Sequence, residues 1–556
     1  MDGTLSQRRI GLLFLIFCVL FAFAAGRAAW LGVVQADELK AAAVTQQRAQ
    51  VDVPAHRGTI TDRRGVELAV SQPASDVSAT PYLVKDPNGV AEKLAPLIER
   101  PQGEILRKLT ERGKGFVYLA RKVPAARAQK VERLEIEGID ATPTSRREYP
   151  RDWLASQVLG TVGADGEGLS GLEYRYEDKL RGRDGQRSVV RDATGEAITI
   201  RDPRRALAGS DLQLTLDAGI QNRVEEILGE IGQKYRPKGA TAVVMDPHSG
   251  DVLALGNWPK VNANDVGGAP PTARQNRATG FVYEPGSTFK PFTVAAALEE
   301  REVTEDTMFN LPPQIQVADR TIGESHPRGY VSLTTSGILA QSSNVGTIMI
   351  GQRLGAKKFD QWVRRFGFGR PTGIDLPGEE GGIVLPLDKY SGSSMGNLPI
   401  GQGESVTPIQ LASAYSAIAN GGVLRTPRLI DKANGKAVRP TPGKRVISEQ
   451  TSKEVRDMLK GVVAAGGTAS EVEIEGYTLA GKTGTANKVD AETGTYSKSR
   501  YIASFAGFAP ADNPELLITV MVDEPGGGNI YGGEVAAPAF EDIARFALPY
   551  LGIAPK

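Results

Sequence analysis

The length, composition and charge of the chain are those of a globular protein with more than one domain. Its 556 residues exceed what one compact core normally accommodates, and 40% of them are hydrophobic and 24% charged. The 66 Lys and Arg residues against 65 Asp and Glu give a formal net charge of +1, which argues against a polyanion such as nucleic acid as a partner.

The first predicted element is a membrane-spanning helix. Residues 10–26 carry no charge, and the apolar character resumes after Arg27, so the predicted anchor covers residues 10–34. Arg27 can reach the outer headgroups with its long side chain, which allows the span to continue past it. The sequence therefore predicts a single-pass protein of the cytoplasmic membrane.

The charges around this helix predict its orientation. Arg8 and Arg9 precede the apolar run, so residues 1–9 are expected to form a cytoplasmic tail, with the bulk of the chain on the outer, periplasmic or extracellular, face. The alternative is a cleaved signal peptide, because Ala22–Ala24 fits a small-x-small cleavage pattern. Both interpretations export the rest of the chain.

Residues 35–206 are predicted to form a mixed α/β domain without a catalytic cluster. Residues 35–50, rich in Ala and Gln, predict a helical stalk. The segments 58–70 and 185–202 predict strands joined by turns that contain Gly and Asp. Between them, residues 92–109 have the apolar spacing of helices.

A second α/β domain is predicted for residues 207–556, after a charged and then small linker at 201–211. Residues 218–235 predict an amphipathic helix, and residues 239–257 predict a hairpin of two apolar runs around a Pro/Ser/Gly turn. Further predictions are strands at 212–217 and 515–524 and helices at 292–300 and 409–420.

Cysteine and histidine are too few and too scattered for several kinds of catalytic site. The single cysteine, Cys18, permits neither an intramolecular disulfide nor a zinc site built on cysteine. His56, His248 and His326 form no H-E-x-x-H pattern, and no Ser-His-Asp triad is evident. We therefore expect a mechanism that needs no histidine, metal or cofactor.

Two short motifs in the second domain carry hydroxyl and amine chemistry. Ser287 and Lys290, three apart before a helical run, would share one helix face, where a buried neutral lysine can take the serine proton. Ser342 and Asn344 offer a hydroxyl for proton relay and an amide to hold a peptide carbonyl. Taken alone, the first motif is better explained as an exposed helix start, and the second as an N-cap or turn.

A third motif, Lys482-Thr483-Gly484-Thr485, is predicted to lie on a strand. There Thr483 and Thr485 would face the same side and could bind a carboxylate through two hydroxyls. Gly484 permits close approach of a substrate to the backbone, and Lys482 adds positive charge. A plain edge strand is the alternative interpretation.

The segment 476–483 also matches the phosphate-binding P-loop pattern formally. A P-loop must run into a helix, but Gly484 and Asn487 are poor helix residues. The tail after Asp523 is too short for the rest of such a fold, and the domain is expected outside the cell, where ATP is absent. We therefore reject an ATPase.

Together the three motifs, in this order, resemble the signature of penicillin-binding proteins and serine β-lactamases. Longer segments, such as YEPGSTFKPF and GQGESVTPIQLASAYSAIANGG, are similar to class B penicillin-binding proteins. So are RGTITDRRG (57–65), REYP (147–150) and GLSGLEYRYEDKLRG (168–182) in the first domain, and the resemblance spans about residues 57–545. Arg64 departs from the family, which usually has Asn there.

This resemblance implies a transpeptidase domain of the serine β-lactamase/penicillin-binding type, with a central antiparallel sheet and flanking helices, behind a transmembrane helix and a dimerisation-like pedestal at 35–206. It implies a D,D-transpeptidase that cross-links peptidoglycan stem peptides through an acyl-enzyme on Ser287, releases D-alanine and is inhibited by β-lactams. The implied catalytic residues are Ser287, Lys290, Ser342, Asn344 and Lys482, and the implied substrate-binding residues are Thr483, Gly484 and Thr485.

The resemblance also implies partners and leaves other functions open. Besides stem peptides, β-lactams and the membrane, a polytopic membrane glycosyltransferase and division proteins are expected. A septal role in cell division fits best in length and domain order, with elongation or sporulation as alternatives. A β-lactamase or carboxypeptidase would use water as acceptor, and a silent scaffold or β-lactam sensor is opposed by the intact Ser287, Lys290 and Lys482.

Overall fold

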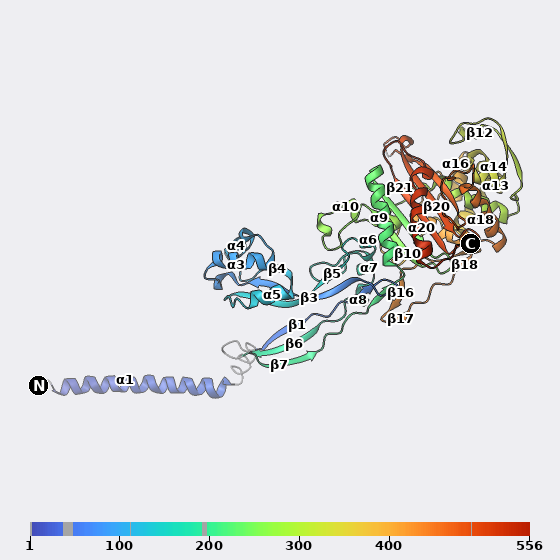
Figure 1. Ribbon diagram of the computed structural model, residues 1–556. Helices are drawn as coiled ribbons and strands as arrows, with labels where there is room; N and C mark the ends of the chain where they lie inside the picture. The colour runs from blue at the N-terminus through green and yellow to red at the C-terminus, as the bar shows by residue number, and fades with distance from the viewer. Residues whose placement is uncertain (1–2, 37–47, 112, 192–196, 491, 556) are drawn as a thin grey trace.

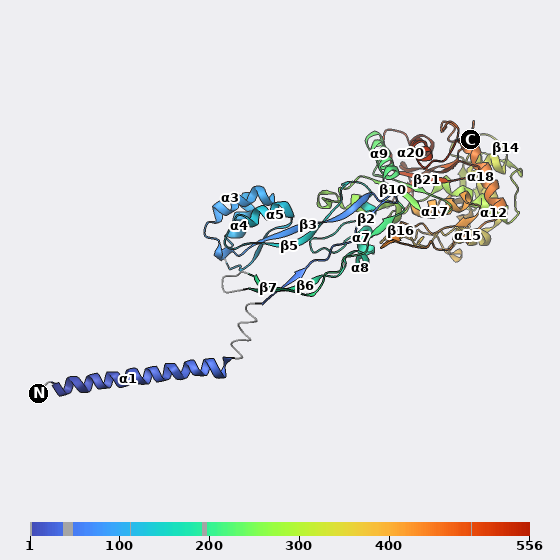
Figure 2. The same cartoon turned by 60° about the horizontal axis from the view of Figure 1, so that its bottom comes forward.

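The computed structural model describes residues 3–36, 48–111, 113–191, 197–490 and 492–555. The chain passes from an N-terminal helix into an elongated pedestal and then into a larger lobe that contains the C-terminus (Figures 1 and 2).

The N-terminal helix α1 (Gly3–Ala29) continues as one π-helical turn, η1 (Trp30–Val34). The stretch Arg9–Val34 is long and apolar enough to cross a membrane, and none of its most apolar window is buried against the protein. This is consistent with the predicted anchor. The predicted stalk helix lies largely outside the described residues, and it is wrong at its end, because Arg48–Val53 forms strand β1. There, pairing with strand β6 overrides local helix propensity.

The pedestal contains strands of two sheets and three longer helices. Its strands are β2 (Ile60–Thr61), β3 (Glu67–Ala79), β4 (Val117–Pro124), β5 (Ile139–Glu148), β6 (Gly185–Arg191) and β7 (Ala197–Arg204), and its longer helices are α3 (Pro87–Ile98), α4 (Gln102–Leu109) and α5 (Ala125–Glu132). The helices α3 to α5 pack with the strands β3 to β5 in one apolar core. Strands β1, β6 and β7 form a separate antiparallel sheet. Because β7 extends to Arg204, the predicted linker at 201–211 is wrong over its first four residues.

A buried ion network joins three pedestal segments. The carboxylate of Glu173, fully buried, accepts from Arg57 Nε and Arg147 Nε, each at 2.6 Å. Tyr149 donates its hydroxyl to the same carboxylate at 3.4 Å. These residues come from the segments 57–65, 147–150 and 168–182, so the charges compensate one another in the pedestal interior.

One sheet joins the pedestal to the larger lobe. It has the strand order β17-β16-β8-β2-β3-β4, with β5 also paired to β3. The strands from the larger lobe are β8 (Leu212–Leu214), β16 (Ile430–Ala433) and β17 (Lys436–Ala437). Arg64 adds a contact beside this junction, because its Nε lies 3.0 Å from Asp217 and its guanidinium lies over the Tyr550 ring at 4.4 Å.

The larger lobe is built on a five-stranded antiparallel sheet of order β10-β9-β21-β20-β19, as predicted for the fold class. Its strands are β9 (Gly239–Met245), β10 (Val252–Trp258), β19 (Ala480–Val489), β20 (Tyr496–Ala509) and β21 (Leu516–Asp523). Strand β19 continues through the third motif, so the segment 476–483 does not run into a helix and is no P-loop.

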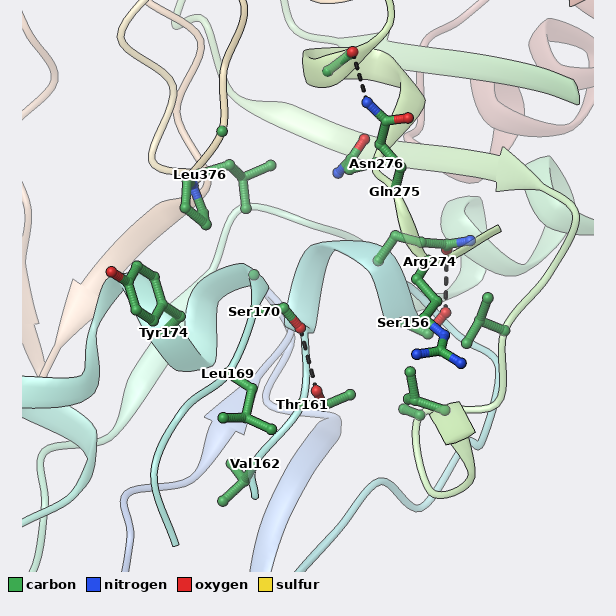
Figure 3. A pocket seen from close by; sticks show the side chains of 18 of the residues that line it. Ser156, Thr161, Val162, Leu169, Ser170, Tyr174, Arg274, Gln275, Asn276 and Leu376 are labelled. Carbon is green, nitrogen blue, oxygen red and sulfur yellow. Dashed lines mark hydrogen bonds between the residues drawn. The ribbon is translucent and has the colours of Figure 1, made fainter. Parts of the chain in front are cut away.

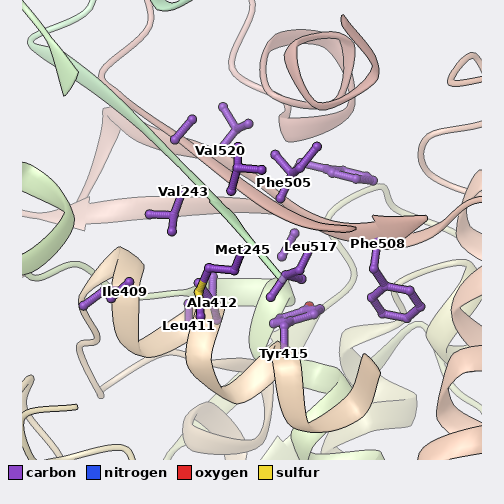
Figure 4. Packing of buried hydrophobic residues seen from close by; sticks show 14 of the residues in the cluster. Val243, Met245, Ile409, Leu411, Ala412, Tyr415, Phe505, Phe508, Leu517 and Val520 are labelled. Carbon is purple, nitrogen blue, oxygen red and sulfur yellow. The ribbon is translucent and has the colours of Figure 1, made fainter. Parts of the chain in front are cut away.

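Helices cover both faces of this sheet. Helices α9 (Ala218–Tyr235) and α20 (Ala537–Tyr550) pack together on one face, and α17 (Pro408–Ala419) packs on the other. Figure 4 shows Ile409, Leu411 and Tyr415 of α17 beneath Met245 and Leu517 of the sheet. Every residue of β9 and β21 is buried, so both strands are mostly apolar on both faces rather than alternating.

Five further helices of this lobe pack against one another. They are α12 (Lys290–Glu299), α13 (Thr335–Ala340), α14 (Asn344–Leu354), α15 (Ala356–Arg365) and α18 (Glu449–Val463). Two small antiparallel pairs lie beside them: β11 (Met308–Leu311) with β14 (Val331–Thr334), and β12 (Gln314–Val317) with β13 (Arg320–Gly323).

Candidate active site

The turn that carries Ser287 is held rigidly. It is a single 3-10 turn, η4 (Gly286–Phe289), that runs directly into α12. Gly286 has φ of 53°, a left-handed conformation that favours glycine. Tyr415 donates its hydroxyl to the Thr288 carbonyl at 2.7 Å, which ties the turn to α17. No hydrogen bond among the described residues uses the half-buried Ser287 hydroxyl, which leaves it free to react.

Lys290, one turn after Ser287, is completely buried beside the second motif. Its Nζ donates to the Ser342 carbonyl at 2.6 Å and to Asn344 Oδ1 at 2.7 Å, and it lies 3.3 Å from Ser342 Oγ. Burial lowers the pKa of the Lys290 amine to about 7, against an upward effect of Glu324 and with a further downward effect of Arg328. A neutral amine has two hydrogens, which these two short bonds use, so its lone pair remains available.

The second motif lies between α13 and α14 in a strained turn. Ser342 has φ of 58°, which places its backbone in the left-handed region and exposes its carbonyl to Lys290. Ser343 is the N-cap of α14, because its hydroxyl accepts from the Gly346 amide at 3.0 Å. The alternative N-cap interpretation thus applies to Ser343, whereas Ser342 and Asn344 contact the lysine.

The third motif lies on strand β19. Lys482 is fully buried, and its Nζ donates to the Thr483 carbonyl at 3.2 Å. Burial holds the pKa of Lys482 well below its ordinary value, and the nearby charge of Lys290 lowers it further. Thr483 shares a hydroxyl–hydroxyl bond of 2.7 Å with Thr468, and Thr485 Oγ1 accepts from the Gly532 amide at 3.1 Å.

Strand β19 and the nucleophile turn lie in direct contact. A methyl group on Gly484 would lie 2.8 Å from Thr288 Cγ2 and 3.2 Å from the Pro285 carbonyl oxygen. A methyl group on Gly286 would lie 3.1 Å from Ala486 Cβ. The fold therefore brings all three motifs together, although they are separated by many residues in the chain.

Several residues around the site gave no signal in the sequence. Glu324 and Arg328, from the loop after β13, contact the second motif. Thr468 adds a third hydroxyl beside Thr483, and Tyr415 supports the nucleophile turn. The isolated pattern G-E-S-H-P-R does not distinguish these two charged residues from an exposed loop.

Two carboxyl groups, the half-buried Glu284 and the buried Glu404, lie near the nucleophile turn. Glu284 accepts from the Gly403 amide at 3.1 Å and from the Tyr496 hydroxyl at 3.0 Å. Burial raises the pKa of Glu284, and it raises the pKa of the fully buried Glu404 well above its usual range, with a further effect of Glu284. Burial of Glu404 therefore favours its neutral, protonated form. Within the described part of the chain, no group of three His, Cys, Asp or Glu side chains is placed to hold a metal ion.

A separate cavity of about 840 Å³ lies between the pedestal and the larger lobe (Figure 3). Ser170 and Tyr174 line it from the pedestal side, and Arg274, Asn276 and Leu376 line it from the other. The eight site residues predicted from the sequence are all described, and none of them lines it. This cavity is distinct from the site that the three motifs build.

Two family models match the chain. Residues 52–214 match the penicillin-binding protein dimerisation domain, and residues 240–545 match the penicillin-binding protein transpeptidase domain. The second match contains all three motifs, and the first covers most of the pedestal.

Curated relatives match nearly the whole chain. The peptidoglycan D,D-transpeptidase FtsI of Escherichia coli (strain K12) is 34% identical over 547 residues, which cover 97% of this chain and 91% of that protein. The stage V sporulation protein D of Bacillus subtilis (strain 168) is 35% identical over 566 residues, with 99% and 87% covered.

A solved structure shows the same arrangement of domains. Penicillin binding protein 3 of Mycobacterium tuberculosis, complexed with aztreonam, is 31% identical and superposes with a TM-score of 0.72. The match covers 91% of this chain and 98% of that one.

Proposed function

The chain belongs to the class B penicillin-binding proteins, and from this premise we propose that it is a peptidoglycan D,D-transpeptidase that acylates Ser287. The observation that carries the proposal is the position of Lys290, which follows Ser287 by three residues. Its buried amine donates hydrogen bonds to Ser342 and Asn344. A neutral amine in this place can act as general base.

Acylation begins when the Ser287 hydroxyl attacks the carbonyl between the last two D-alanines of a stem peptide. Lys290 takes the hydroxyl proton, and the backbone N–H groups of Ser287 and Thr485 stabilise the oxyanion. Ser342 passes a proton to the departing D-alanine. An amine of a neighbouring stem peptide then attacks the ester, forms the cross-link and releases Ser287.

The rest of the site orients the donor peptide. Thr483 and Thr485 bind the terminal carboxylate, with Lys482 supplying positive charge, and Gly484 lets the peptide approach the strand. Asn344 holds the donor amide. β-Lactams follow the same route and leave a long-lived ester, which the aztreonam and ampicillin complexes of the mycobacterial relative support.

The proposal also includes the location of the protein in the cell and the roles of its domains. The apolar helix anchors the chain in the cytoplasmic membrane, with residues 1–9 inside and the site outside. Residues 35–206 serve as the pedestal and 207–556 as the transpeptidase domain. The likeness to FtsI over nearly the whole chain favours septal wall synthesis, beside a polytopic glycosyltransferase and division proteins, and the likeness to a sporulation protein makes sporulation the second candidate.

The test is the intact mass of the detergent-solubilised full chain after incubation with a penicillin. We expect one covalent adduct on Ser287 in the natural chain and none in Ser287→Ala. Ser336→Ala, which removes a half-buried hydroxyl that donates to the Glu305 carbonyl outside the motifs, is the control and should keep the adduct. Hydrolysed drug without an adduct would indicate a β-lactamase, and neither adduct nor hydrolysis from folded protein would indicate a silent scaffold.

A further inference from the structure

Glu324 lies where the β12–β13 hairpin meets the second motif. It follows β13 directly, and its side chain is only 6% exposed. One carboxylate oxygen accepts from Ser343 Oγ at 2.6 Å, and the other accepts from the Asn344 backbone amide at 2.6 Å. The carboxylate thus binds the first free N–H of α14, where a negative charge is favourable.

Arg328 completes this contact. Its Nη2 donates to Glu324 Oε1 at 2.6 Å and to Ser343 Oγ at 2.9 Å. Ser343 Oγ therefore donates to Glu324 and accepts from both Arg328 and the Gly346 amide, which fills its hydrogen-bonding capacity. Glu324 and Arg328 thus bind the first residue of α14 and its N-cap, Ser343, through hydrogen bonds.

Asn344 is fixed at three points as a result. Its backbone amide binds Glu324, its Nδ2 donates to the Gly323 carbonyl at 3.1 Å, and its Oδ1 accepts from Lys290 Nζ at 2.7 Å. Two of these three contacts come from consecutive residues, Gly323 and Glu324. Any movement of this pair would therefore move the amide that holds the lysine.

We propose that Glu324, held by Arg328, is a positioning residue that fixes Asn344 and, through it, the Lys290 amine beside Ser287. The inference rests on the proposed acylation of Ser287 with Lys290 as its base. Glu324 touches the motif residues rather than the substrate, so it acts through Asn344.

The charges of Glu324 and Arg328 also affect the pKa of Lys290. The charged groups that face Lys290 are Glu324 and Arg328 on the loop after β13 and Lys482 on β19. Glu324 favours the ammonium form and Arg328 disfavours it. Loss of the carboxylate should lower the pKa of Lys290, and loss of the guanidinium should raise it.

The experiment measures the second-order rate constant of acylation by a fluorescent penicillin, with the full chain in detergent, from pH 5 to pH 9. In Glu324→Gln we expect the maximal rate constant to fall roughly tenfold. The acidic limb of the pH profile, where the rate constant rises with pH, should move to lower pH by about half a unit or more. In Arg328→Gln the limb should move to higher pH. Glu324→Asp keeps the charge, so its limb should stay in place while the shorter side chain lowers the maximum.

Asp319→Asn is the matched control, because it removes an exposed carboxylate from the same hairpin. It should change neither the maximum nor the limb. The proposal would be overturned if Glu324→Gln had the same maximal rate constant and the same acidic limb as this control. A lower maximum with an unmoved limb in both Glu324→Gln and Arg328→Gln would also overturn it, because it would leave the pair a structural role only.

Ser287→Ala separates this inference from the proposed function. If that variant still forms the adduct, acylation of Ser287 itself is wrong. If it forms none while the Glu324 and Arg328 variants behave as the control does, the proposed function stands and the positioning role alone fails.

Discussion

Lys290 and Lys482 are buried side chains whose hydrogen-bond partners, in the part of the chain that the structure describes, are all neutral. A buried ammonium without a bonded carboxylate is costly, so both amines release their protons more readily than in water. Such perturbed groups cluster at functional sites, where the lost stability is the cost of a base that works near neutral pH.

The pH dependence of acylation should show the lowered pKa of Lys290 directly. Because only the neutral amine can accept the Ser287 proton, and burial lowers the pKa of Lys290 to about 7, the rate constant should fall as pH drops through this value. Below it we expect about a tenfold loss for each pH unit. Lys290→Arg, whose guanidinium stays charged, should lose acylation across the whole range. A natural chain with a flat profile from pH 5 to pH 9 would contradict Lys290 as the base.

At the scale of elements, the site depends on the fit between strand β19 and the nucleophile turn. Gly484 has no room for a side chain, since a methyl group would lie 2.4 Å from Ser504 Oγ as well as close to Thr288. Strand and turn can therefore approach each other closely at Gly484, because Thr288 and Pro285 of the turn occupy the space that a side chain would need.

Gly484→Ala should therefore impair acylation more than it impairs folding. The added methyl group must push β19 away from the turn, so we expect a loss of at least about tenfold in the acylation rate constant and a destabilisation of about 1–3 kcal/mol. Gly329→Ala is the control, because nothing lies within 4 Å of its added methyl group. Stopped-flow acylation and thermal unfolding of both variants test this, and equal acylation rates would argue against a close fit.

At the scale of the whole molecule, the pedestal is joined to the catalytic lobe by a continuous sheet and has its own charged interior. Strands β2 and β8 pair in parallel across the junction. Within the pedestal, Glu173 neutralises Arg57 and Arg147, neither of which is exposed by more than 6% of its side chain. The pedestal thus owes its shape to a buried ion network as well as to its apolar core.

Removing the centre of this network should destabilise the pedestal strongly. Glu173→Ala removes the carboxylate that pairs with both Arg57 and Arg147, and among the described residues only Arg57 keeps another bonded carboxylate, Glu177. We expect a loss of about 3–5 kcal/mol in the free energy of unfolding. Glu167→Ala, which removes an exposed carboxylate that pairs with Arg181, should cost less than about 1 kcal/mol. Urea unfolding of both variants measures the difference, and equal midpoints would show that the network contributes nothing net.

The apolar N-terminal helix, the mixed pedestal, the α/β lobe and the three motifs could be predicted from the sequence, because periodicity and short spacings are local properties of the chain. The placement of Ser287 and Lys290 one helical turn apart was predictable for the same reason. Other features depend on tertiary contacts. The tertiary structure turned residues 48–50 into a strand through pairing with β6, and it brought Glu324 and Arg328 to the second motif. Contacts between distant segments depend on how whole elements pack, and no local pattern of residues encodes them.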